Sequence, residues 1–171
     1  MAGGLYETIF PLSAKAVAVI DGPRGLLPML LGSGLSYVLV QATVIGPLTK
    51  RFSHRSLLIS SGLALSLCNG LMIVAGQIGS ALAVTVTMMA TAAAAGIILP
   101  VIQLMASNLA AEDQRGTVLG VMGSAGTLAR TISTVASFAL FGQLHIHVPY
   151  LVAVIIALIL VYSAKRLPAG G

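Results

Sequence analysis

The sequence predicts an all-α protein, a polytopic bundle of transmembrane helices. Hydrophobic residues make up 57% of its 171 residues and charged residues only 8%. A soluble domain carries about 25% charged residues, so there are too few charges here for a water-facing surface. The apolar residues also gather in runs of about 20, the length that crosses a bilayer as a helix. These runs lack the alternating pattern of membrane β-strands, so helices are the expected spanning elements.

Five apolar runs are long enough to be full spans: residues 25–48, 56–75, 78–106, 117–141 and 148–164. The fifth is short but near the lower limit of about 17 residues. Residues 1–24 precede the first span and are expected to hold the end of another helix and an outer loop. Their apolar part carries Glu7 and Pro11, so it does not read as a complete span.

Basic residues mark every second loop, and these are Lys50, Arg51, Arg55, Arg115, Lys165 and Arg166. The intervening turns, residues 76–79 and 142–148, contain no Lys or Arg. Loops rich in Lys and Arg stay on the cytoplasmic side of a membrane. The pattern therefore predicts an integral membrane protein whose C-terminus is cytoplasmic.

Arg130 is the most informative polar residue. It lies near the middle of the run 117–141, roughly 17 to 20 Å from either end at 1.5 Å per residue. A charge at that depth costs at least about 2.5 kcal/mol and needs a partner or a wet cavity. Helical phase places it on one face with Gly120, Gly123, Thr127 and Thr134, which we expect to look inward. A substrate or gating contact and a structural tie to neighbouring carbonyls are both open.

Three further residues are candidates for a translocation path. Glu7 is the one acid that reaches membrane depth if a helix precedes it, so it is the expected partner of Arg130. Gln41 and Gln103 lie within spans, where an interhelical hydrogen bond is the main alternative to contact with a substrate.

Other chemistry is not indicated. His145 and His147 lie in one turn without a Cys or carboxylate to complete a metal site. No nucleotide loop, zinc-protease motif or serine-nucleophile setting is present, so neither an enzyme nor a cofactor is predicted. The net charge of +5 is dispersed over short loops, which does not suit nucleic acid.

The loop from Gly46 to Arg55 resembles the signature loop of the major facilitator superfamily, in the copy found in the C-terminal half. Gly46, Arg51 and Arg55 fit the signature, while Lys50 and Ser53 stand in place of its aspartate and second glycine.

Three more stretches resemble the drug:proton antiporter branch of that family, which includes tetracycline-efflux-like and zinc-induced-facilitator-like carriers. Residues 6–12 are similar to its seventh helix, residues 112–120 to the loop entering its eleventh, and residues 128–132 to that helix around its arginine. The resemblance implies that the five spans are helices eight to twelve, and that residues 5–14 end helix seven.

The resemblance implies the C-terminal half of a secondary transporter, with proton-coupled efflux of a small molecule by alternating access. Expected partners are the lipid bilayer, a small-molecule substrate, protons, and the other half or another helical bundle. The alternative is a half-length membrane protein that does not transport, either regulatory or vestigial.

Overall fold

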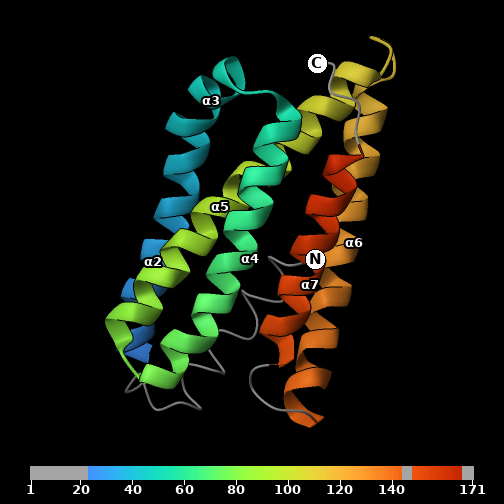
Figure 1. Cartoon of the computed structure of the whole chain (residues 1–171). Coiled ribbons are helices and arrows are strands. Elements are labelled where there is room, and N and C mark those ends of the chain that lie inside the picture. The colour runs from blue at the N-terminus through green and yellow to red at the C-terminus, as the bar shows by residue number, and fades with distance from the viewer. Residues whose placement is uncertain (1–22, 144–147, 167–171) are drawn as a thin grey trace.

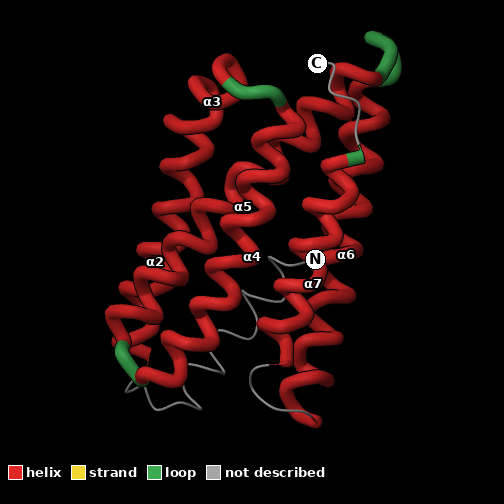
Figure 2. Tube along the Cα trace, in the orientation of Figure 1, coloured by secondary structure: helices red, strands yellow, loops and turns green. Residues whose placement is uncertain are grey.

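The computed structural model describes residues 23–143 and 148–166, with side chains over 27–136 and 150–166. Within these ranges every regular element is a helix and none is a strand (Figure 2). This confirms the predicted all-α class. Glu7 and the partial helix expected before the first span lie outside the described residues, as do His145 and His147.

The first predicted span is one continuous helical rod in three parts. These are α2 (Pro23–Leu39), the π-helical segment η1 (Val40–Val44) and α3 (Ile45–Arg51). In the π-helical segment the N–H of Ile45 reaches back five residues to the carbonyl of Val40. The rod ends where Phe52 turns extended, three residues beyond the apolar run that predicted it. The π-helical segment has no counterpart in the sequence prediction.

Helices α4 (His54–Ile78) and α5 (Ala81–Leu109) each begin at a serine cap. Ser53 Oγ accepts from the N–H of Ser56 at 3.3 Å, and Ser80 Oγ accepts from the N–H of Ala83 at 3.4 Å. Gly79 ends α4 in the left-handed conformation, with φ of 69°. This glycine sets the turn, so the predicted span starting at residue 78 begins too early.

Two further helices complete the described fold, α6 (Arg115–Gln143) and α7 (Val148–Lys165). Helix α4 lies between α5 and α7 and packs extensively against both, while α2 packs on α5 (Figure 1). Helix α6 touches α5 and α7 only lightly. The described bundle therefore has a well-packed part, made of α2, α4, α5 and α7, and a loosely attached α6.

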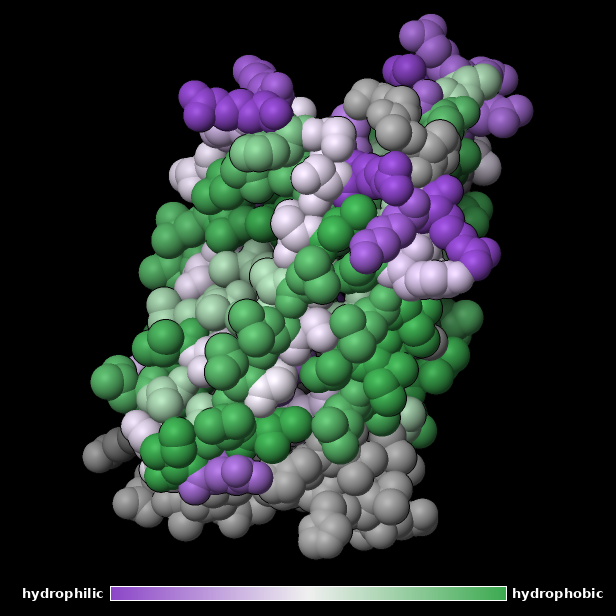
Figure 3. Space-filling model, in the orientation of Figure 1, coloured by the Kyte–Doolittle hydropathy of each residue, from purple (hydrophilic) through white to green (hydrophobic). Residues whose placement is uncertain are grey.

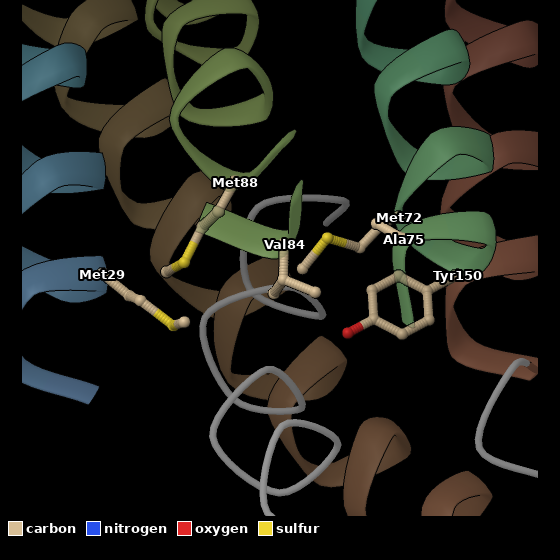
Figure 4. Packing of buried hydrophobic residues seen from close by; sticks show 6 residues of the cluster. All are labelled: Met29, Met72, Ala75, Val84, Met88 and Tyr150. Atoms are coloured by element: carbon tan, nitrogen blue, oxygen red, sulfur yellow. The ribbon is translucent and has the colours of Figure 1, made fainter. Parts of the chain in front are cut away.

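The core is stacked in three layers along the bundle. Figure 4 shows the largest, in which three methionines from three helices meet a tyrosine of α7; its members are Met29, Met72, Ala75, Val84, Met88 and Tyr150. A second layer consists of Leu65, Ala94 and Ala157, and a third of Leu57, Leu58, Val101 and Ala164. Small alanines alternate with larger side chains, which allows the helices to approach closely.

The outer surface is apolar over most of its height (Figure 3). Leu82 is 75% exposed and Leu67 is 65% exposed, which suits contact with lipid rather than water. Within the residues that the structure describes, three helices are long and apolar enough to cross a membrane: Leu27–Arg51, His54–Ile78 and Ala81–Leu109. Among the described residues α7 is apolar but shorter, and α6 is less apolar because it carries glycines, threonines and Arg130.

Candidate functional site

Charged side chains gather at one end of the bundle, where α3 and α7 end and α4 and α6 begin (Figures 1 and 3). The charged residues at this basic end are Lys50, Arg51, Arg55, Glu112, Asp113, Arg115, Lys165 and Arg166. Six of these eight are basic. Among the side chains that the structure describes, Arg130 is the one charged group that does not lie at this basic end.

Arg130 lies deep within α6. It follows the start of the helix at Arg115 by about 22 Å and precedes its end at Gln143 by about 20 Å, at 1.5 Å per residue. Arg130 therefore lies near the middle of α6, and its depth in the bilayer stays a prediction. A guanidinium is costly to place in lipid far from both ends of a helix. The groups around Arg130 therefore bear directly on the role of α6.

Helix α6 presents three chemically distinct faces. Residues packed toward the bundle are half-buried or buried and comprise Val118, Met122, Ala129 and Ser133. A second face is exposed and apolar, and comprises Val121, Leu128, Ile132 and Val135. The third face, which we call the polar face, comprises Gly120, Gly123, Thr127, Arg130 and Thr134. Each set falls within about 80° of helical phase, so the three faces are separate stripes.

The polar face was expected to look inward, and the described helices do not cover it. Gly120, Gly123, Thr127 and Arg130 are exposed, and only Thr134 is half-buried. A Cβ built on either glycine meets no atom within 4 Å in the described part of the chain. Within the described part of the bundle α6 packs through its Ser133 stripe, and the inward orientation of the polar face stays a prediction.

The glycines within the spans differ in how closely another helix approaches them. A Cβ built on Gly32 would lie 3.2 Å from Met89 Sδ across the α2–α5 contact. By contrast, a Cβ built on Gly34 would meet no described atom within 4 Å, and the same holds for Gly116 and Gly126 in α6. The closest approach is at Gly62, where an added Cβ would lie 2.7 Å from Val161 Cγ2, and sequence reasoning did not single out this glycine.

The hydroxyls near Arg130 bond within their own helix. Thr127 Oγ1 donates to the carbonyl of Gly123 at 3.0 Å, and Thr131 Oγ1 donates to that of Thr127 at 3.1 Å. Such back-bonding satisfies a hydroxyl without a second helix. The guanidinium therefore remains the strongest polar group on this face.

No hydrogen bond joins the side chains of Gln41 and Gln103. Gln41 is exposed in the π-helical segment and Gln103 is half-buried in α5, and neither side chain makes a hydrogen bond within the described residues. Counted from the basic end at 1.5 Å per residue, Gln103 lies about 9 Å deep, Gln41 about 15 Å and Arg130 about 22 Å. By this count the three polar groups lie at different distances from the ends of their own helices.

The signature-like loop is a tight reversal between α3 and α4. Gly46, Lys50 and Arg51 are exposed, and Lys50 and Arg51 form the last turn of α3. Arg55 reaches from the first turn of α4 to donate through Nη2 to the carbonyl of Lys165, at the end of α7. This bond ties the loop to a helix more than 100 residues away in the chain.

Two polar features escaped the sequence analysis. Asn69 is 2% exposed in α4 and donates through Nδ2 to the carbonyl of Leu65 at 2.8 Å. An asparagine within an apolar run is a visible signal, and it was overlooked. The second feature that the sequence analysis missed is the π-helical segment around Gln41. Such segments often occur at functional sites.

The apolar surface, the spanning helices and the single deep arginine define an integral membrane protein. A family model described as Major Facilitator Superfamily matches residues 22–169. The chain therefore belongs to the major facilitator superfamily, and is a membrane transporter of that class. No curated protein matches it.

Proposed function

We propose that the chain is the C-terminal half of a secondary transporter, which exports small molecules in exchange for protons by alternating access. The observation that supports this best is Arg130 at mid-depth on the exposed polar face of α6. Ionisable residues at that depth usually mark substrate or ion pathways. Secondary transporters place substrate and coupling ion near the bilayer midplane, between two bundles.

In this proposal the polar face of α6 borders the translocation path. Arg130 binds an anionic or electron-rich group, and Gln103 and Gln41 offer amide donors and acceptors between it and the basic end. Glu7 is the proposed charge partner of Arg130, from its place in the sequence. The pair separates when a proton or a substrate takes the place of one partner.

The basic end faces the cytoplasm in this proposal, together with the C-terminus, because loops rich in Lys and Arg remain on that side. The polar face then requires a cover other than lipid. A second helical bundle supplies it, so the isolated chain is expected not to transport.

Transport can be tested without knowing the substrate. The chain is extracted in mild detergent, and its monomeric and assembled fractions are separated by size and reconstituted into vesicles that enclose a pH-sensitive dye. A pH gradient is imposed, and a panel of lipophilic cations and anions is tested for compounds that dissipate it. We expect such a compound for the assembled fraction and none for the monomer.

Arg130→Ala in the assembled fraction is the specific test. It should abolish the response while helix content, insertion and assembly remain unchanged. Thr131→Ala is the matched control, since Thr131 is exposed on the same helix and satisfied by a backbone carbonyl. An assembled fraction whose Arg130→Ala variant dissipates the gradient like the wild type would refute the assigned role. Robust transport by the monomer would refute the need for a second bundle.

A further inference from the structure

Three basic residues lie near one another in the fold, where α4 begins and α7 ends. Arg55 Nη2 donates to the carbonyl of Lys165, which places the Arg55 guanidinium at the last turn of α7. Arg166 follows directly, and its N–H donates to the carbonyl of Ser163 at 3.1 Å. We call Arg55, Lys165 and Arg166 the α4–α7 cluster.

No acidic side chain among the described residues balances this cluster. The one ion pair found there joins Arg115 to Glu112 at 4.0 Å, in the turn before α6. Capping the end of α7 accounts for one of the five N–H donors of Arg55. The cluster therefore keeps three positive charges and several donors for an anion.

The cluster lies directly against an apolar, exposed face of α7. The guanidinium of Arg166 is 4.6 Å from the ring centre of Tyr162 and also donates to its hydroxyl. Tyr162 is 58% exposed, and Ile159, one turn deeper, is also 58% exposed. Tyrosine and arginine are typical of the level where lipid headgroups meet acyl chains.

We propose that the α4–α7 cluster binds the phosphate-bearing headgroup of an anionic phospholipid, with the acyl chains running along Tyr162 and Ile159. Basic pockets between transmembrane helices are suited to such headgroups. The apolar face below the cations favours a lipid over a dissolved phosphate ion, which would contact the cations alone. The inference does not depend on the proposed transport function.

The chain contains no tryptophan, so one can be introduced as a local reporter. Ile159→Trp places it on the exposed face of α7, one turn below the cluster, and leaves Tyr162 and Arg166 intact. The full chain is reconstituted into vesicles of equal parts phosphatidylglycerol and phosphatidylcholine. One lipid or the other carries brominated acyl chains, which quench the fluorescence of a neighbouring tryptophan.

We expect brominated phosphatidylglycerol to quench more strongly, with a relative association constant of about five in its favour, the preference expected for roughly one fully engaged cation. Lys165→Gln combined with Arg166→Gln should lower the constant to about one. This double variant keeps the Arg55 cap of α7, and circular dichroism checks that its helix content is unchanged.

Two controls decide whether the preference is local. Lys50→Gln combined with Arg51→Gln removes the same charge from the same end of the bundle and should leave the preference intact. A reporter at Leu82, 75% exposed at the start of α5, should show no preference.

Equal loss of the preference in both double variants would indicate a diffuse effect of surface charge and would overturn the proposed lipid site. Abolition of the preference by inorganic phosphate would identify a soluble anion as the occupant instead.

Discussion

Among the described glycines, Gly62 leaves the least room for a side chain. A Cβ added to this glycine in α4 would lie 2.7 Å from Val161 Cγ2 and 3.0 Å from Leu160 Cδ2, both in α7. Val161 is 5% exposed, and its β-branched side chain has few rotamers to retreat into. Gly62→Ala must therefore push the two helices apart or force Val161 out of its preferred rotamer.

The size of the effect follows from that overlap. Ordinary contact begins at 3.4 Å, so the new methyl group lies about 0.7 Å too close to Val161 Cγ2. Overpacking of this kind costs about 1–3 kcal/mol. Alanine in place of glycine within a helix offsets about 1 kcal/mol of this through its higher helix propensity. We expect Gly62→Ala to destabilise the α4–α7 contact by up to about 2 kcal/mol.

Gly70→Ala is the matched control. It lies in the same helix about two turns further on, and a Cβ there meets no described atom within 4 Å. Gly70→Ala therefore gains helix propensity without a clash and should be neutral or slightly stabilising. Reversible unfolding of both variants in mixed detergent micelles, followed by circular dichroism, gives the difference directly.

Val161→Ala provides the second half of a double-mutant cycle. Removing Cγ2 should relieve the clash, so the double variant should be more stable than the sum of the two single changes by about 1 kcal/mol or more. If Gly62→Ala is as stable as Gly70→Ala, and Val161→Ala shows no coupling to it, the close α4–α7 approach is wrong.

Three further outcomes are expected. Gly79→Ala should cost about 1 kcal/mol of stability in the same unfolding assay, because its φ of 69° is unfavourable for any residue with a side chain; an unchanged midpoint would contradict this geometry. In a Cys68→Ala background, single cysteines at Lys50 and Arg115 should both react with an impermeant reagent from the same membrane side, and labelling from opposite sides would refute the proposed topology. Arg130→Ala should lose transport in the assembled fraction with helix content retained, as measured by the pH-gradient assay.

Much of the fold follows from the sequence because a backbone in lipid can satisfy its hydrogen bonds in only a few ways. A backbone in hydrocarbon must bond to itself, so long apolar runs become helices. The buried hydroxyls show the same constraint, since Ser61 donates to the carbonyl of Leu57 at 2.6 Å and Thr91 to that of Thr87 at 2.8 Å. The depth of Arg130 also follows from counting residues, because the rise of a helix is constant.

What the sequence does not predict depends on contacts between helices. Gly62 and Gly70 look alike in the sequence, yet only Gly62 faces α7 closely. The π-helical segment shifts one hydrogen bond at Ile45, a change that residue type alone does not specify. For a related reason, helical phase groups the residues of the α6 polar face on one side but does not say which neighbour covers that side.

The three faces of α6 constrain what lies against it. Leu128 and Ile132, 62% and 50% exposed, offer lipid an apolar stripe, whereas the neighbouring stripe carries a guanidinium that acyl chains solvate poorly. On that stripe Gly120 and Gly123 have no side chain, so another backbone can approach closely beside Arg130. Whatever lies against the polar face must therefore be compatible with a guanidinium about 22 Å along α6 from its start at Arg115.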